Sequence, residues 1–109
     1  MKQLAIGCPI ARTASLIGDR WTPLVVRDLS SGSRRFVELQ RSLEGISPKT
    51  LADRLRRLEE AEVITRASFA EMPPRVEYEL TAKGVALLPI IESMRDFGDT
   101  WCATPRCAR

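Results

Sequence analysis

The stretch GISPKTLADRLRRLEE, residues 45–60, combines a helix start with an amphipathic helix. Ser47 can cap the helix and Pro48 can occupy its first position, because the N–H that proline lacks has no partner there. Three leucines then recur at i, i+4 and i+7, which predicts one buried stripe. At about 100° per residue, polar positions turn outward. The stripe is Leu51, Leu55 and Leu58, and the outward positions are Lys49, Asp53, Arg56, Arg57 and Glu60.

A shorter helix is predicted immediately before this one. Ser33 can cap it, and Phe36, Leu39 and Leu43 fall on one face at helical spacing. The glycine in LEGI then turns the chain. Two short helices joined by a glycine-containing turn form the helix-turn-helix pattern, in which the second helix enters the major groove of DNA. We expect this unit to span about residues 34–61.

The basic residues of the chain are concentrated in this unit. The whole protein has a net charge of +3, whereas residues 34–57 contain seven lysines and arginines and three acids, a local charge of +4. A concentrated basic segment attracts phosphate backbones. Arg35 and Arg57 are therefore candidates for DNA contacts, together with residues of the second helix. A solvated helix face is the alternative explanation of the same charges.

A β-hairpin is predicted directly after the helix-turn-helix. VITRASF, residues 63–69, is rich in β-branched and aromatic residues, and the two prolines of EMPP favour a turn. RVEYEL, residues 75–80, alternates charged and apolar residues, which predicts one buried face. The whole unit is then a winged helix, with the wing at about residues 63–80. Arg75 would lie over the DNA backbone or minor groove; the alternative is that it only keeps an edge strand soluble.

Two helices are predicted before the helix-turn-helix. Cys8, followed by proline, marks a helix start and Gly18 is a natural stop, so the first helix should cover about residues 9–18. The second begins near Thr22, a suitable cap, or a few residues earlier. Its expected buried face is Trp21, Leu24, Val25 and Leu29.

A long C-terminal helix, about residues 82–101, is predicted with Thr81 as its cap. Pro89 removes a backbone donor, so a break is expected near Leu88. The helix carries a wide apolar stripe that a small winged-helix domain has little left to cover, which favours a second subunit. The alternative is that the stripe folds back on its own core. The stripe is Leu87, Ile90, Ile91, Met94, Phe97 and Trp101.

The length of 109 residues suits a single domain, residues 1–109. The chain has no histidine, the commonest general base and metal ligand, and no Gly-rich phosphate loop or Ser/His/Asp set. We therefore expect neither an enzyme nor a bound cofactor. No stretch approaches the roughly 20 apolar residues of a membrane span, and the first residues are too short and polar for a secretory signal. A cytoplasmic protein without a membrane partner is expected.

Three stretches of the chain resemble the HxlR-type winged helix-turn-helix regulators of bacteria, in the MarR-like superfamily. They are CPIARTASLIGDRWTPLVVRDL, RRFVELQRSLEGISPKTLADRLRRLEEAEVITR and PPRVEYELTAKGVALLPII, and the resemblance runs from Cys8 to about Trp101. It implies a mainly α fold with a small β-hairpin wing, dimerising through its N- and C-terminal helices. It also implies DNA contacts from Ser47, Lys49, Thr50, Asp53 and Arg54, and from Arg75 in the wing.

These features together predict a sequence-specific transcriptional repressor that binds double-stranded DNA as a homodimer. Two recognition helices would enter successive major grooves about 34 Å apart, on a pseudo-palindromic operator. A winged-helix protein-interaction module without DNA binding is the alternative, although such a module has no need of cations on that helix.

The three cysteines suggest a response to oxidants. Cys8 precedes the first helix, whose N-terminus favours the reactive thiolate, and Cys102 and Cys107 follow the last helix. If these helices pack across a dimer, Cys8 would approach a cysteine of the partner subunit. Some family members resemble this arrangement. Oxidation would then change DNA affinity. A small molecule at the dimer junction is the other expected kind of effector. The alternatives are a buried packing role for Cys8, a zinc site of three cysteines, and a small thiol enzyme built on Cys102 and Cys107.

Overall fold

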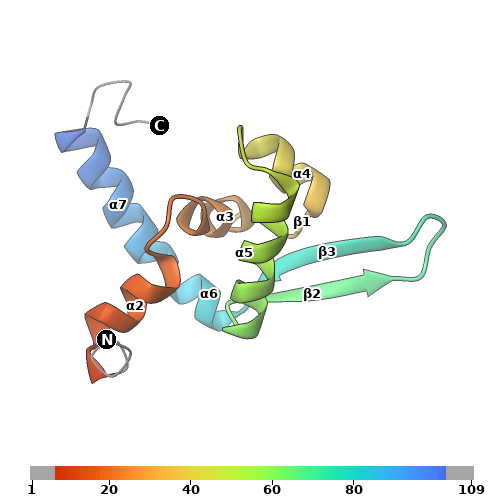
Figure 1. Ribbon diagram of the computed structural model, residues 1–109, viewed down its shortest axis with the longest axis horizontal. Coiled ribbons are helices and arrows are strands. Elements are labelled where there is room, and N and C mark those ends of the chain that lie inside the picture. Colours follow the sequence, from red (N-terminus) through yellow and green to blue (C-terminus); the bar gives the residue numbers. More distant parts are fainter. Residues whose placement is uncertain (1–6, 103–109) are drawn as a thin grey trace.

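A computed structural model describes residues 7–102 and shows a mainly helical protein with a projecting β-hairpin (Figure 1). Helix α3 lies near the centre, the hairpin extends to one side, and α2 and α7 extend to the other. This arrangement confirms the predicted mainly α fold with a wing. The elements in chain order are α2 (Pro9–Ile17), α3 (Thr22–Leu29), β1 (Arg34–Arg35), α4 (Phe36–Ser42), α5 (Pro48–Glu60), β2 (Ile64–Phe69), β3 (Arg75–Leu80), α6 (Ala82–Ala86) and α7 (Leu88–Trp101).

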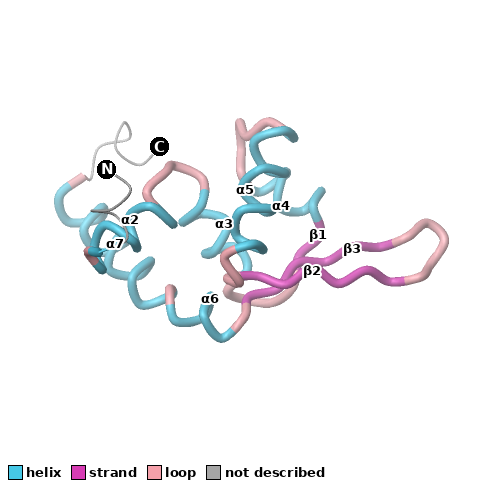
Figure 2. The backbone as a smooth tube through the Cα atoms, turned by 60° about the horizontal axis from the view of Figure 1, so that its bottom comes forward, coloured by secondary structure: helices cyan, strands magenta, loops and turns pink. Residues whose placement is uncertain are grey.

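The wing belongs to a three-stranded antiparallel sheet with the strand order β1-β3-β2 (Figure 2). In the β2–β3 hairpin, Ile64 pairs with Leu80 at the base and Phe69 with Arg75 at the far end. The sequence predicted this hairpin but not β1, because a strand of two residues has no pattern of its own. Burial also differs from the expected alternation, since β2 is exposed beyond Ile64 and most of β3 is only half-buried.

The short strand β1 explains why the predicted cap of α4 is wrong. Ser33 does not cap the helix; its hydroxyl donates to Glu77 Oε1 on β3 at 3.1 Å. Pairing with β3 keeps the next two residues extended, so that Arg35 becomes the N-cap and the helix begins at Phe36. The Arg35 N–H then donates to Glu38 Oε1 at 2.8 Å, which satisfies one backbone donor at the helix start.

The expected cap of α3 is also wrong. Thr22 lies inside the helix and is buried, and the capping side chain comes from Asp19, three residues earlier. Asp19 Oδ1 accepts from the backbone N–H groups of Trp21 at 2.8 Å and Thr22 at 2.9 Å. The Asp19 carboxylate, which precedes the first turn, therefore accepts from backbone N–H groups at the start of α3 and takes the capping role expected of Thr22.

One apolar core joins the helices to the base of the sheet. The predicted stripe of α5 is confirmed, since each of its three leucines is at most 2% exposed. On α7 the expected stripe divides between two surroundings: Leu87 and Ile91 close the core, whereas the other positions remain exposed. The buried set is Ile17, Val25, Val26, Leu29, Leu39, Leu43, Ile46, Leu51, Leu55, Leu58, Val63, Ile64, Leu87 and Ile91.

The C-terminal helical region is broken where proline predicted a break. Thr81 Oγ1 accepts from the Gly84 N–H at 3.1 Å and caps α6, as expected. The helix ends at Ala86, and α7 starts again at Leu88 with Pro89 in its first turn. The break lets α6 stay against the sheet while α7 extends past α3 (Figure 1).

At Gly84 the fold leaves no room for a side chain. A Cβ there would clash with the Val63 backbone oxygen and lie 2.9 Å from the Leu80 side chain. Gly84→Ala is therefore expected to lower the free energy of unfolding by about 1–3 kcal/mol, although alanine ordinarily favours helices. Urea unfolding measures this. Gly98→Ala in α7 is the matched control, because its Cβ meets nothing within 4 Å and should stabilise by about 0.5–1 kcal/mol. Equal effects of the two substitutions would contradict the packing argument.

Candidate nucleic-acid interface

The start of α5 presents a polar tip to solvent. Ser47 Oγ accepts from the Thr50 backbone N–H at 3.1 Å and donates to the Thr50 hydroxyl at 2.9 Å. This confirms the predicted cap, and Pro48 follows it as the first helical residue. Lys49 is exposed and has no hydrogen bond or ion pair among the described residues. The tip therefore offers the Thr50 hydroxyl and the open Lys49 ammonium group as donors to base edges or phosphates, and the Ser47 oxygen as an acceptor.

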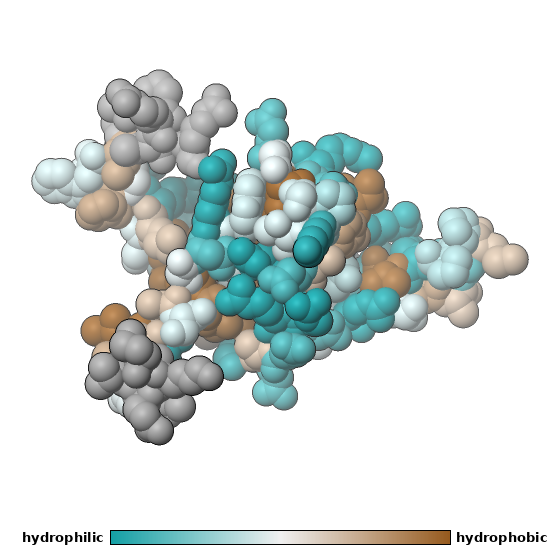
Figure 3. All heavy atoms as spheres, in the orientation of Figure 1, coloured by the Kyte–Doolittle hydropathy of each residue, from teal (hydrophilic) through white to brown (hydrophobic). Residues whose placement is uncertain are grey.

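Farther along α5, Asp53 lies within ion-pair distance of three arginines. Its carboxylate binds Arg54 at 2.7 Å and Arg56 at 2.6 Å, and Arg57 lies 3.9 Å away. Arg56 and Arg57 are exposed and Asp53 is half-buried between them. The carboxylate fixes the direction of these long side chains and partly offsets their charge. Figure 3 shows hydrophilic side chains gathered over this part of the surface.

Arg54 differs from its neighbours because it also binds a residue 35 positions earlier. Its Nε donates to Asp19 Oδ1 at 3.2 Å, while Nη1 donates to Asp53 Oδ2 at 2.7 Å. The Arg54 side chain is only 22% exposed. The family resemblance implied a DNA contact for Arg54, but its partner Asp19 was not predicted. The signal for Asp19 was a short acidic residue two positions before Trp21 at a helix start.

The carboxylate of Asp19 is held in its charged form. Partial burial by itself raises the pKa of Asp19, but hydrogen bonds outweigh it and hold the pKa below the ordinary value of 3.8. They come from the Thr22 side chain and backbone, from the Trp21 backbone and from Arg54. The Thr22 hydroxyl donates at 2.6 Å. Asp19 therefore bonds to the start of α3 and to the middle of α5 at once.

The remaining predicted cations lie apart from α5 in sequence. Arg35 is exposed at the junction of β1 and α4. Arg75, at the start of β3, lies 3.1 Å from Glu71 and 3.3 Å from Glu77, and its guanidinium stacks over the Phe69 ring at 4.3 Å. The Nε of Arg75 is close to Glu77 but is not aligned for a hydrogen bond. Arg75 thus braces the wing and shares its charge with two acids.

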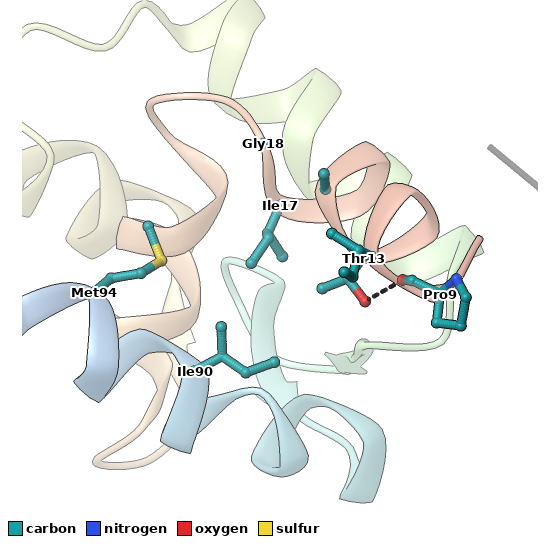
Figure 4. A pocket seen from close by; sticks show the side chains of 8 residues that line it. Pro9, Thr13, Ile17, Gly18, Ile90 and Met94 are labelled. Atoms are coloured by element: carbon teal, nitrogen blue, oxygen red, sulfur yellow. Dashed lines mark hydrogen bonds between the residues drawn. The ribbon is translucent and has the colours of Figure 1, made fainter. Parts of the chain in front are cut away.

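On the opposite side of the protein, α2 and α7 enclose an apolar groove, here called the α2–α7 groove. Ile17 of α2 points toward Ile90 and Met94 of α7, and the Thr13 hydroxyl is bonded to the Pro9 carbonyl at 3.0 Å (Figure 4). The groove has a volume of about 540 Å³. Its lining residues are Pro9, Ile10, Thr13, Ala14, Ile17, Gly18, Ile90 and Met94.

The apolar surface continues beyond this groove along α7. Phe97 is 61% exposed and Trp101 is 74% exposed, and across the groove Ile10 of α2 is 80% exposed. Phe97 and Trp101 belong to the apolar stripe predicted for the last helix, and the structure leaves both exposed. So much exposed apolar surface on two neighbouring helices is typical of a protein–protein contact.

The structure places two of the three cysteines. Cys8 is exposed and forms the N-cap of α2, so the alternative of a buried packing role is wrong. Cys102 is half-buried at the C-cap of α7 and borders a second, smaller pocket between α3 and α7. The start of α2 and the end of α7 point away from each other in Figure 1. Cys107 lies outside the described residues.

Between residues 7 and 102, no three cysteine, aspartate or glutamate side chains gather in a way that would hold a metal ion. Over the same residues, every helix is too short or too polar to cross a lipid bilayer.

The lowered pKa of Asp19 predicts a pH-dependent contribution to stability. Asp19→Ser keeps a capping oxygen for α3 but removes the carboxylate. The wild type should be more stable than this variant at neutral pH, where the carboxylate is charged in both folded and unfolded chains. The difference should shrink as the pH falls below 3.8 and through the lower pKa of the folded state. Urea unfolding over a pH series measures it, and a difference that is constant with pH would contradict the role of the charge.

Comparison with known proteins identifies the fold and its family. The profile of HxlR-like helix-turn-helix proteins matches residues 16–106. The uncharacterised HTH-type transcriptional regulator sll1512 of Synechocystis sp. is 42% identical over 100 residues, which cover 92% of this chain and 74% of that protein. The HTH-type transcriptional regulator YodB of Bacillus subtilis is 40% identical over 96 residues, covering 87% of this chain and 86% of YodB.

Solved structures agree with the sequence relatives. The reduced form of the redox regulator HypR superposes with a TM-score of 0.82 at 32% identity, covering 85% of this chain and 92% of HypR. The reduced form of YodB from B. subtilis gives a TM-score of 0.75 at 40% identity, covering 87% and 94% of the two chains. These relatives are transcriptional regulators and not enzymes. With its cationic helix-turn-helix, its braced wing and its matching profile, the chain belongs to the HxlR-like helix-turn-helix family of transcriptional regulators.

Proposed function

We propose that this protein is a sequence-specific DNA-binding repressor that acts as a homodimer on a pseudo-palindromic operator and responds to oxidants through Cys8. The observation that carries the DNA-binding part is the exposed tip of α5. Lys49 stands open beside the Ser47 and Thr50 hydroxyls, on a helix whose other face is fixed in the core. A rigid helix with free donors at its N-terminus meets the need of major-groove recognition.

In this proposal the DNA-facing residues have different tasks. Lys49, Thr50 and Ser47 reach base edges or the nearest phosphate, and Asp53 keeps the arginines of α5 in place. Arg35 and Arg57 are both exposed and bind phosphates on either side of the groove. Arg75 approaches DNA from the wing while it remains bonded to its two acids, and Arg54 contributes through its bonds rather than through an open guanidinium.

The proposed dimer uses the α2–α7 groove and the exposed face of α7. A second copy would cover apolar side chains that water now reaches, which is favourable in proportion to the area removed from water. A closed two-fold contact also places two α5 helices symmetrically, as a pseudo-palindromic operator requires.

The proposed redox response follows from the positions of the cysteines. Cys8 is exposed beside the α2–α7 groove, on a helix start that points away from the end of α7 in the same chain. A disulfide from Cys8 to Cys102 or Cys107 of a second copy would therefore form across the dimer. HypR has been solved in reduced and oxidised forms and YodB after diamide treatment, which supports a thiol-based response in this chain.

The function is tested by selecting the purified, reduced protein on random DNA duplexes and repeating the selection after mild oxidation. An enriched inverted repeat is expected in the reduced state. Its affinity should fall steeply with salt, because phosphate contacts release counterions. No enriched sequence at low salt would contradict the proposal and favour a protein-interaction module.

Substitution of Lys49 tests the role of the α5 tip. Lys49→Ala should weaken operator binding by about 10-fold or more, because a good base or phosphate contact contributes about 1–3 kcal/mol. Fluorescence anisotropy with the selected duplex measures the change. Lys83→Ala is the matched control, since Lys83 lies on α6 and donates to the Ala61 carbonyl at 2.7 Å. Equal losses in the two variants would place the DNA elsewhere.

Phe97 is the substitution that tests the dimer. Phe97→Glu puts a charge on the exposed face of α7 and should shift the reduced protein from dimer to monomer, because burying an unpaired carboxylate in an apolar contact is unfavourable. Sedimentation velocity measures the masses. Val37→Glu, at an exposed apolar residue of α4, should remain dimeric. A wild-type protein that is already monomeric at micromolar concentration would contradict the dimer.

Cys8 is the substitution that tests the redox response. Oxidation by hydrogen peroxide would join two thiols into a disulfide, with two electrons and two protons passing to the peroxide to form water. In the wild type this should give a covalent dimer on a non-reducing gel and a change in operator affinity. Cys8→Ser should show neither change. Oxidant-dependent affinity that persists in Cys8→Ser would remove Cys8 from the mechanism.

A further inference from the structure

The junction between α2 and α3 is tied to the recognition helix by one side-chain pair. Asp19 follows Gly18, the C-cap of α2, and its carboxylate also caps the start of α3. The Arg54 Nε donates to this same carboxylate at 3.2 Å. Between residues 7 and 102, this is the one hydrogen-bonded or ionic link from a side chain of α5 to a residue outside α5 and its cap.

The other forces that hold α5 do not fix its orientation in the same way. The leucine stripe is buried, but apolar burial is non-directional and tolerates small rotations of the helix. A guanidinium bonded to two carboxylates is directional, because its planar donors must meet both oxygens. Arg54 binds Asp19 on one side and Asp53 on the other. The bond to Asp19 therefore adds a directional restraint on small rotations of α5 about its own axis relative to the end of α2.

The local geometry leaves little freedom at the other end of this link. A Cβ on Gly18 would clash with the Ala14 carbonyl oxygen, so the end of α2 is tightly turned. Asp19 is then held by three donors from α3, at 2.6, 2.8 and 2.9 Å. The carboxylate that Arg54 meets is thus fixed both to α2 through the chain and to α3 through hydrogen bonds.

The charges argue against Arg54 as a direct reader of DNA. Its side chain is 22% exposed, compared with 63% for that of Arg56 on the same helix. The two carboxylates that bind it offset its positive charge. Its Nε and Nη1 are bonded to Asp19 and Asp53, so a phosphate or a guanine edge would meet this cation with two carboxylates already beside it.

We propose that Arg54 is a positioning residue for operator recognition, which holds the tip of α5 in its reading orientation by its bond to Asp19. The proposal rests on the DNA-binding function proposed above. Because Asp19 adjoins α2, the same bond connects the orientation of the recognition helix to the groove that a second subunit would cover.

The operator affinity of an Asp19 variant tests the proposal, because positioning and simple charge repulsion predict opposite changes in affinity. Removing an acid near DNA ordinarily strengthens binding. Asp19→Ser removes the carboxylate but keeps a capping hydroxyl for α3, and we expect it to weaken operator binding by about 10-fold. Its affinity for random duplexes should not fall, since phosphate contacts remain. Tighter operator binding by Asp19→Ser would overturn the proposal.

A double-mutant cycle tests whether Asp19 and Arg54 act together. Arg54→Gln should weaken operator binding by about as much as Asp19→Ser, and the double variant by no more than either single variant. Additive losses would show that each residue acts alone and would overturn the proposal. Arg56→Gln is the matched control, because Arg56 shares Asp53 with Arg54 but has no bond to Asp19. Its effect should add to that of Asp19→Ser.

Two further measurements separate positioning from a phosphate contact. Arg54→Lys keeps the charge but lacks the planar donors needed to bridge two carboxylates, so it should behave like Arg54→Gln. The salt dependence of operator binding should have the same slope in the wild type and Arg54→Gln. A slope reduced by about one, or full affinity in Arg54→Lys, would identify Arg54 as a phosphate contact.

Folding and the underlying function are controlled separately. Thermal unfolding of each variant shows the temperature range in which it is folded, and affinities are compared only within that range. A wild-type protein that selects no duplex would overturn the DNA-binding function, and the positioning role with it. A wild-type protein that selects an operator which Asp19→Ser binds equally well would overturn the positioning role alone.

Discussion

The burial of one leucine stripe determines how the rest of this protein is arranged. Leu51, Leu55 and Leu58 are at most 2% exposed, so that α5 can present only its opposite face to solvent. That face carries the concentrated positive charge of the chain. With the helix anchored in this way, Ser47 and Lys49 at its capped start are exposed to solvent. Polar or bulky residues in the stripe would therefore disturb the exposed face as well as the core.

Much of this architecture could be predicted from the sequence, because the relevant signals are local. Ser47 and Pro48 start a helix by their own chemistry, and leucines at helical spacing identify the buried side. Pro89 likewise marks a break whatever surrounds it. The wing was visible because β-branched residues and prolines occur in adjacent stretches. Its expected buried face was less accurate, since no second layer covers the outer part of the hairpin.

The features that the sequence did not reveal depend on contacts between distant residues. Ser33 bonds to Glu77 instead of capping α4, and β1 exists because β3 lies beside it. Asp19 was a weak local signal, and its partner Arg54 is 35 residues away. The candidate site shows the same limit: Lys49 lies open as its position on the helix predicts, whereas Arg75 is braced by Glu71 and Glu77. Helical periodicity shows which way a side chain faces but not which acid it meets.

The divided stripe of α7 has a consequence for how the protein would work at low abundance. Leu87 and Ile91 complete the core of their own chain, while Phe97 and Trp101 remain outside it. Each chain therefore buries its core within itself and leaves the outer part of α7 to a partner. If only the dimer binds DNA, the occupancy of a promoter rises more steeply than linearly with the concentration of the protein. The exposed face of α7 would then make promoter occupancy sensitive to small changes in the number of protein molecules.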